Sequence, residues 1–220
     1  MSNLLFDPIK TQSKVTNNVI VAFSGGKDSI VTLDLCKKYF PTVEVFFMYL
    51  VPNLDFQERM LQWYENKYGL KIHRIPHFEL SEFMKWGTFR PMDIDIPLVK
   101  INDVYSYIRN ETGIYWIAAG ERAADSMVRN AMLKKSGAID KKRGRFYPVM
   151  YWKKNEILEY IKQKKLYLSP EQRDIGFSFR GFTGKELSII KNRFPDDYKK
   201  ILDMFPFAGA AAERYEKYGK

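Results

Sequence analysis

The sequence predicts an α/β fold built around a parallel sheet. Over the first 75 residues, apolar runs typical of strands buried on both faces alternate with stretches of helical periodicity. A glycine-containing turn, SGGKDS, stands between the first apolar run and the first helical stretch. The length of 220 residues suits one domain, or one domain with an extension.

The β-α-β-α-β order of these 75 residues follows from residue type and spacing. The run VIVAF is rich in β-branched residues and ends at a glycine turn. Asp28 and Ser29 then supply helix-start chemistry, and Pro41 and Gly69 punctuate the two helices. Parallel strands connected in this way need right-handed crossovers. The expected strands are 19–23, 44–51 and 71–75, and the expected helices are 28–39 and 55–67.

The remaining elements are expected from the same patterns. Residues 76–96 contain Pro76, Gly87 and Pro91, so we expect an irregular segment, typical of an active-site loop or lid. We expect an α/β domain over 1–165 and a helical extension over 166–220 that packs on the same domain. The expected strands are 115–119 and 145–151; the helices are 98–110, 123–133 and 153–164, with further helical stretches near 185–194, 198–205 and 208–218; residues 136–144 form a basic loop.

Composition excludes several classes of protein. Hydrophobic residues make up 45% and charged residues 28%, which is an ordinary globular balance rather than a disordered, collagen-like or coiled-coil one. No apolar run reaches the roughly 18–20 residues of a membrane helix, and the N-terminus does not resemble a secretory signal. The single cysteine, Cys36, excludes an intrachain disulfide and a thiolate zinc site. We therefore expect a soluble, cytoplasmic protein without membrane contact.

The positive charge is concentrated in one stretch. Of a formal net charge of +10, residues 131–165 contribute +8, with 11 basic and 3 acidic side chains. Such a field favours an anionic partner, either a polyphosphate or a nucleic acid. Lys141, Lys142, Arg143 and Arg145 lie around Gly144, an arrangement that suits a flexible arm closing on phosphates. A solvated basic face that aids solubility explains the excess equally well.

The most specific chemical signal is SGGKDS at residues 24–29, here called the 24–29 loop. Adjacent glycines allow a tight turn and close approach to a ligand, and the following helix presents N–H groups and a positive dipole end. Ser24, Lys27 and Ser29 add donors and charge, so the loop suits a pyrophosphate group. Asp28 is an anion within an anion site, for which Mg²⁺ bridging Asp28 and the phosphates is the economical explanation. A Walker loop and a dinucleotide fingerprint do not fit.

The loop and three later segments together resemble the PP-loop superfamily of adenine nucleotide α-hydrolase-like proteins. SGGKDS is similar to the signature of this superfamily, to which the N-type ATP pyrophosphatases belong. GERAADSMVR at 120–129 resembles its phosphoadenosine phosphosulfate (PAPS) reductase branch. YPVMYW at 147–152 and DIGFSFRG at 174–181 resemble two further segments of that branch, and all four occur in the expected order. The resemblance spans about residues 17–206.

This resemblance implies a three-layer, doubly wound sheet sandwiched by helices, with the nucleotide at the carboxyl ends of the strands. It also implies an enzyme that cleaves ATP at the α-phosphate, transfers adenylate to an unidentified acceptor and releases pyrophosphate. Domain 1–165 would bind the nucleotide, and Gly120 would allow close approach of the backbone. The expected partners are an adenine nucleotide and an anionic acceptor, with a nucleic acid bound through 131–165 as one alternative; a homo-oligomer or a partner protein stays open. The residues implied are Ser24, Gly25, Gly26, Lys27, Asp28, Ser29 and Gly120 for ATP binding, Asp28 for Mg²⁺, and Lys27, Asp28, Arg122 and Arg129 for catalysis.

The chain also departs from the PAPS reductase pattern. Those reductases attack sulfate with a C-terminal cysteine thiolate, and residues 205–220 contain no cysteine. Cys36 lies among apolar neighbours on a helix, which favours a packed thiol over a nucleophile. Two alternatives to ATP cleavage stay open: a sulfonucleotide reductase or sulfotransferase that uses a partner's thiol, and a non-catalytic nucleotide- or nucleic-acid-binding subunit.

Overall fold

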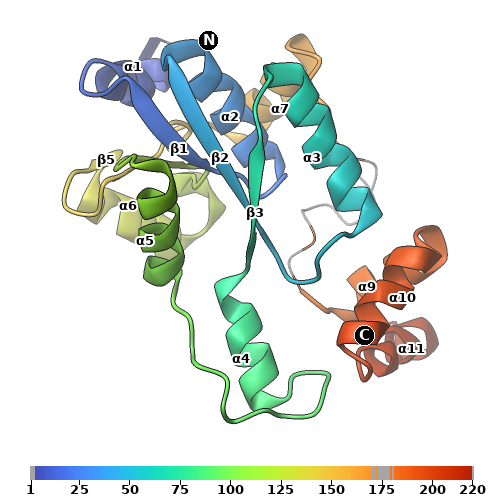
Figure 1. The fold of residues 1–220 in the computed structure, drawn as a ribbon. Helices are drawn as coiled ribbons and strands as arrows, with labels where there is room; N and C mark the ends of the chain where they lie inside the picture. The colour runs from blue at the N-terminus through green and yellow to red at the C-terminus, as the bar shows by residue number, and fades with distance from the viewer. Residues whose placement is uncertain (1–2, 170–171, 173–178, 180, 220) are drawn as a thin grey trace. The chain divides into compact units, whose positions relative to one another are not determined.

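One six-stranded sheet contains all the strands of the residues that the computed structural model describes, namely 3–169, 172, 179 and 181–219. The strand order is β3-β2-β1-β4-β6-β5, and Figure 1 labels β1, β2, β3 and β5 of this sheet. The pairs β1–β2, β1–β4 and β4–β6 are parallel, and the edge hairpin of β5 with β6 is antiparallel. The strands are β1 (Asn18–Ala22), β2 (Thr42–Tyr49), β3 (Ile72–Pro76), β4 (Ile117–Ala119), β5 (Ile139–Asp140) and β6 (Arg145–Phe146). The predicted α/β class with a mostly parallel sheet is confirmed.

Helices connect the strands and form the C-terminal part of the chain. In β1, the side chains of Val19, Ile20 and Val21 are fully buried, as expected for a strand covered on both faces. The helices that follow the predicted pattern are α2 (Lys27–Tyr39), α3 (Asp55–Tyr68), α5 (Ile101–Thr112), α6 (Met127–Ser136) and α7 (Lys154–Gln163), then α9 (Gly184–Arg193), α10 (Pro195–Met204) and α11 (Gly209–Tyr218). Short 3₁₀ segments, η1 (Asn3–Phe6) and η2 (Ala123–Asp125), and helix α1 (Asp7–Ser13) complete the set.

The structure corrects the expectation that residues 76–96 are irregular. Helix α4 (Phe78–Trp86) occupies the first half of this segment (Figure 1). The Nδ1 atom of His77 accepts a hydrogen bond from the N–H of Glu79 at the helix start, and Gly87 ends the helix with a left-handed φ of 70°. The proline and glycine that predicted an irregular segment therefore mark the limits of a helix.

A second correction concerns the predicted strand at 145–151. Strand β6 ends at Phe146, because Pro148 lacks an N–H for the ladder and the chain turns instead. The N–H of Met150 donates to the carbonyl of Tyr147 at 3.1 Å, and that of Trp152 to the carbonyl of Val149 at 3.0 Å. These buried turns carry the chain from β6 to the start of α7.

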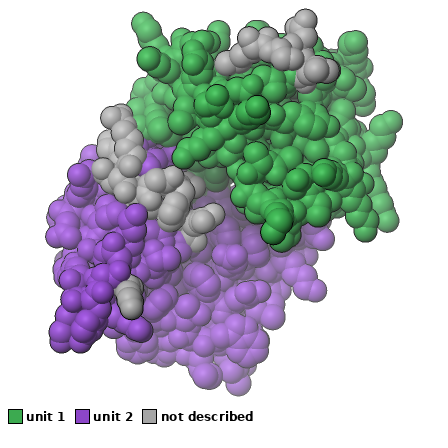
Figure 2. Space-filling view, turned by 180° about the vertical axis from the view of Figure 1, so that it is seen from behind, with its two compact units in different colours: residues 1–47, 63–73, 108–168 green, residues 48–62, 74–107, 169–220 purple. Residues whose placement is uncertain are grey.

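The chain divides into two compact units, shown separately coloured in Figure 2. Unit 1 consists of residues 1–47, 63–73 and 108–168, and unit 2 of residues 48–62, 74–107 and 169–220. In unit 2, Phe182 and Phe205 lie in an apolar core, with ring centroids 4.5 Å apart, and α9 packs against α10 and α11 (Figure 1). The predicted domain limits at 1–165 and 166–220 stay a prediction. Among the described residues, no helix has the length and apolar character that crossing a membrane requires.

Candidate functional site

The 24–29 loop connects the carboxyl end of β1 to the start of α2 in unit 1. Gly25 has a φ of 71°, a conformation that favours glycine, and Gly26 is the N-cap of α2 with extended backbone. The first helical hydrogen bond runs from the N–H of Ile30 to the carbonyl of Gly26 at 3.0 Å. The N–H groups of the three preceding helical residues therefore have no acceptor within the helix. Together with the helix dipole, they form a cradle suited to an anion.

Two serines brace the loop from within. The hydroxyl of the buried Ser29 donates to the carbonyl of Gly26 at 2.9 Å and accepts from the N–H of Ser24 at 3.2 Å. The hydroxyl of Ser24 donates to that of Ser29 at 3.2 Å and accepts from the N–H of Gly26 at 3.3 Å. The two hydroxyls thus fix the turn from within the chain, so the cradle is preformed.

Asp28 is neutralised by two cations of the same unit. Its Oδ2 atom lies 2.6 Å from Nζ of Lys27, and its Oδ1 atom lies 2.8 Å from Nε of Arg122. The contact with Arg122 is an attraction between charges without hydrogen-bond geometry. The carboxylate of Asp28 is the reason to expect Mg²⁺ in an anion site, and the side chains of Lys27 and Arg122 already supply positive charge to it. The described residues also contain no group of three or more His, Cys, Asp or Glu placed to hold a metal ion. Asp28 as a Mg²⁺ ligand stays a prediction.

Arg122 links the loop to the segment that follows β4. Its side chain is only 5% exposed, and its Nη2 atom pairs with the carboxylate of Asp125 while Nη1 donates to the carbonyl of Trp152 at 3.3 Å. Arg129 pairs with the same Asp125 at 3.1 Å, but its side chain is 46% exposed. The guanidinium of Arg122 is thus buried between the loop and residues 120–125, whereas that of Arg129 is accessible to solvent; the catalytic roles expected of both stay predictions.

Gly120 follows β4 and lies against the start of α2. A Cβ atom at this position would lie 2.9 Å from the backbone nitrogen of Ser29 and 3.0 Å from the carbonyl carbon of Asp28. Both contacts are with backbone, which cannot move aside without distorting the loop. The close approach that the sequence predicted for Gly120 is therefore an approach to the loop itself, and its role toward a nucleotide stays a prediction.

The basic residues around Gly144 lie away from this site. The N–H of Ile117, the first residue of β4, donates to the carbonyl of Gly144, and Arg145 pairs with Ile117. The turn at 141–144 is therefore at the amino edge of the sheet, while the 24–29 loop is at the carboxyl edge. The hairpin register therefore fixes this turn at the edge opposite to the 24–29 loop, and the expectation of an arm that closes on the phosphates of an anionic partner stays a prediction.

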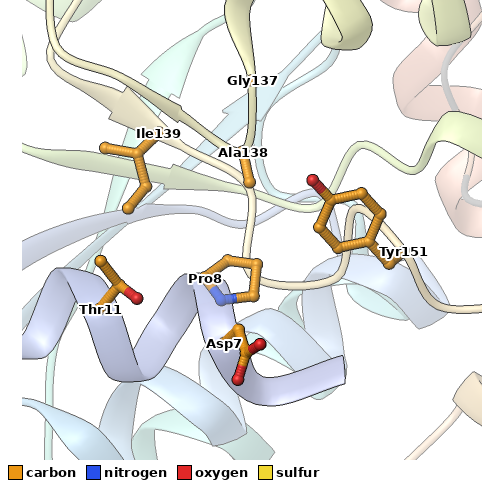
Figure 3. Close-up of a pocket in the computed structure, with 7 residues that line it drawn as sticks. All are labelled: Asp7, Pro8, Thr11, Gly137, Ala138, Ile139 and Tyr151. Atoms are coloured by element: carbon orange, nitrogen blue, oxygen red, sulfur yellow. The ribbon is translucent and has the colours of Figure 1, made fainter. Parts of the chain in front are cut away.

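A cavity of about 690 Å³ in unit 1 offers different chemistry (Figure 3). Its one ionisable acid is Asp7, its hydroxyls belong to Thr11 and Tyr151, and most of its surface is apolar. An anion beside Asp7 would be repelled, so this cavity does not suit nucleotide phosphates. The lining residues are Asp7, Pro8, Thr11, Gly137, Ala138, Ile139 and Tyr151.

The sequence analysis names the loop and both arginines as site residues, but it does not name Asp125, the acid that pairs with both arginines. Asp125 pairs with Arg122 and Arg129, and its spacing of three and four residues to them was a signal for helix-like ion pairs. Cys36 is fully buried, and burial raises the pKa of its thiol far above the usual range. Of the segment DIGFSFRG at 174–181, only Phe179 and Gly181 are among the described residues, so the motif as a whole lies outside them.

Comparisons with known proteins identify a family and a shared fold. A family model of the phosphoadenosine phosphosulfate reductase domain matches residues 18–170. An uncharacterised protein of Methanocaldococcus jannaschii is 27% identical over 213 aligned positions, which cover 86% of this chain. The match covers 42% of that relative, so the chain spans less than half of its length.

Solved structures show the same fold at low sequence identity. PAPS reductase from Candida auris, in a phosphate complex, has a TM-score of 0.55 and 17% identity, covering 80% of this chain and 87% of that one. The NH₃-dependent NAD synthetase of Campylobacter jejuni has a TM-score of 0.52 and 16% identity, covering 98% and 92%. The U34-tRNA thiolase of Methanococcus maripaludis, with its [4Fe-4S] cluster, has a TM-score of 0.51 and 15% identity, covering 92% and 78%. At these identities the likeness concerns the fold.

Proposed function

The chain belongs to the phosphoadenosine phosphosulfate reductase domain family, and we propose that it is an enzyme that binds ATP and cleaves it between the α- and β-phosphates. The adenylate passes to an acceptor and pyrophosphate leaves. The observation that carries the proposal is the 24–29 loop, whose preformed turn presents helix-start N–H groups to an anion. The adenine nucleotides in the names of two solved neighbours, PAPS reductase and NAD synthetase, support the same ligand class.

The proposed step is a displacement at the α-phosphorus. A nucleophilic oxygen or nitrogen of the acceptor forms a bond to the α-phosphorus, while the bond from that phosphorus to the bridging oxygen breaks. The electron pair of this bond remains on pyrophosphate, and the proton of the nucleophile passes to solvent. Positioning of the two reactants supplies a large part of such an acceleration.

Charge on the departing pyrophosphate is stabilised by the loop. The N–H groups at the start of α2 point their partial positive charge at it, and Lys27 adds a full charge once its ammonium turns from Asp28 to the phosphates. Arg129 is exposed and lies in the first turn of α6, so we assign it to the phosphates or to an anionic group of the acceptor. Arg122 is a positioning residue that holds Asp28 and Asp125.

A metal is not needed to explain the charges in this arrangement. Both oxygens of Asp28 already contact cations, so we derive no step through Mg²⁺. Mg²⁺ often binds through one or two carboxylates together with substrate phosphates, and Asp28 is the residue that would contribute here. Dependence of turnover on Mg²⁺ is therefore a proposal to be measured together with the activity.

Reduction of a sulfonucleotide is the second candidate, because the matching family model is named for that reaction. It requires a thiolate, and the thiol of Cys36 is fully buried with a raised pKa. The chain contains no other cysteine. This second function would therefore need a thiol from a partner, which makes ATP cleavage the better-supported proposal.

The experiment compares nucleotide binding and products in two matched variants. Calorimetric titration with ATP should show binding, and Lys27→Ala should weaken ATP binding and any turnover, by on the order of 10²-fold for turnover. Lys38→Ala removes the same charge from the other end of α2 and should leave both unchanged. Binding of PAPS together with no binding of ATP would favour the reductase alternative.

A further inference from the structure

The excess positive charge of the molecule belongs to unit 1. Its segments contain 21 Lys and Arg against 11 Asp and Glu, whereas those of unit 2 contain 15 of each. Unit 1 therefore carries the whole net charge of +10.

The parallel topology brings many of these cations to one edge of the sheet. Helix α2 ends just before β2 begins, residues 67–71 lead into β3, and the turn at 141–144 leads into β6. Helix α7 starts beyond the carboxyl end of β6 and packs along α2, so its last residues also lie at the amino edge. We call this surface the basic edge; its exposed cations are Lys38, Lys67, Lys71, Lys141, Lys142, Arg143, Lys162, Lys164 and Lys165.

Few acids offset these charges. Within three residues of these nine cations along the chain lie Glu65, Asp140 and Glu159, and Glu111 is near the end of α5. Asp140 is buried, and burial by itself would raise the pKa of its carboxyl. The hydrogen bonds from Arg143 outweigh this effect and hold the pKa below its usual range. The ends of α2, α3, α5 and α7 add roughly half a negative charge each, about −2 in all. The negative ends of the helix dipoles therefore offset only a minor part of the positive charge of the nine cations.

Two internal braces hold the basic edge in place. The carboxylate of Asp34 accepts hydrogen bonds from the hydroxyl of Tyr68 at 2.6 Å and from that of Tyr160 at 2.7 Å. These bonds tie α2 to α3 and α7 near the ends that carry the lysines. Burial, and then the bonds to Asp34, raise the pKa of both tyrosines, so the brace persists across the physiological pH range.

The second brace fixes the turn at 141–144. The guanidinium of Arg109 donates to the carbonyls of Tyr115 at 2.8 Å and Arg143 at 2.7 Å, and it lies 4.9 Å from the centroid of the Tyr115 ring. Gly144 has a φ of 58°, and a Cβ there would lie 2.6 Å from that ring. The side chains of Lys141 and Lys142 therefore project from a rigid platform rather than a mobile arm.

We propose that the basic edge binds the phosphate backbone of a nucleic acid. Nine exposed cations spread over four segments match a partner with regularly repeated negative charges better than a single nucleotide, which has its own cradle at the opposite edge. The contacts are with phosphates, so the binding does not depend on base sequence. The proposal does not rest on ATP cleavage, because the two surfaces share no residue.

The test compares two quadruple variants of equal charge change. Lys141, Lys142, Lys162 and Lys164 are changed to Ala in the first, and Lys134, Lys135, Lys153 and Lys154, exposed lysines near the carboxyl edge, in the control. Binding of a 16-base-pair RNA duplex and of the matching DNA is measured by fluorescence anisotropy at several salt concentrations. The unmodified protein should bind with a Kd of about 10⁻⁴–10⁻⁶ M at physiological salt, and each phosphate contact should add about −0.9 to the logarithmic salt slope.

The first variant should bind more weakly, and its logarithmic salt slope should be less steep by at least about 2. The control should have the same affinity and salt slope as the unmodified protein. Lys141→Ala with Lys142→Ala alone should give an intermediate slope and serves if the quadruple variant does not fold. Lys27→Ala should bind RNA normally, which separates this proposal from that of ATP cleavage. No duplex binding even at low salt, equal loss in the control, or binding to phosphatidylserine vesicles but not to duplexes would each overturn the proposal.

Discussion

Replacement of Arg122 by methionine tests the ion network beneath the loop. The guanidinium is 5% exposed and contacts Asp28 at 2.8 Å, Asp125 and the carbonyl of Trp152. Removal of one partner of a buried ion pair typically costs about 3–5 kcal/mol, because the other charge stays buried without compensation. Here Asp28 keeps Lys27 and Asp125 keeps Arg129, so we expect the lower end, about 3 kcal/mol.

The assay is thermal unfolding followed by circular dichroism, with Arg129→Met as the matched control. For a chain of this size, 1 kcal/mol shifts Tm by about 2–4 °C, so Arg122→Met should lower Tm by roughly 6–12 °C. Arg129 is 46% exposed, and a pair of that kind contributes about 0–1 kcal/mol, so its loss should lower Tm by no more than about 4 °C. Equal shifts in the two variants would refute the assignment of Arg122 as the buried link between the loop and residues 120–125.

Three further predictions test the packing and the capping around this fold. Cys36→Ser should lower the free energy of unfolding by roughly 1–3 kcal/mol, since it buries a hydroxyl, and should leave turnover per folded molecule intact; a stable but inactive variant would revive a thiol mechanism. Gly120→Ala should destabilise the protein by about 1–3 kcal/mol in urea titrations and weaken ATP binding in calorimetry. The control is Gly209→Ala, because a Cβ atom there would lie no closer than 3.5 Å to its neighbours, and it should change neither stability nor ATP binding. Burial lowers the pKa of His77 below its ordinary 6.5, although the nearby Glu79 acts in the opposite direction. The neutral imidazole therefore contributes fully to stability above pH 6.5, and this contribution is lost as the pH falls below that value. His77→Asn, which can still cap α4, should show a smaller drop in urea midpoint between pH 7.5 and 5.5, and an unchanged drop would contradict the reasoning.

The strand, loop and helix around residues 18–39 could be predicted from the sequence because each has a local signal. A continuous apolar run, two adjacent glycines and a helical repeat all occur within about twenty residues of one another. The observed limits of β1 and α2 differ by about one residue from the expected ones. The sequence does not predict helix α4, because Pro76 and Gly87 are also typical of irregular segments. The same residues are typical of the two ends of a helix, and the burial of Leu80 decides between these alternatives.

Long-range contacts were beyond the sequence. The pairing of β1 with β4 brings Ala22 beside Ala119, and only this register places Arg122 against Asp28. The basic stretch 131–165 shows the same limit, because its lysines are neighbours in sequence but divide between opposite edges of the sheet. The sequence shows which residues carry the excess positive charge, and the strand order determines on which surface they lie.

The most direct test of ATP cleavage is product analysis with α-labelled ATP. The protein is incubated with this ATP, Mg²⁺ and a pooled extract of small metabolites and RNA that offers a range of acceptors, and labelled products and pyrophosphate are quantified. We predict release of pyrophosphate in an amount equal to the labelled AMP and adenylated acceptor together, with both reduced on the order of 10²-fold in Lys27→Ala. Formation of ADP and phosphate, or equal product yields from the protein and Lys27→Ala, would contradict cleavage at the α-phosphate by the 24–29 loop.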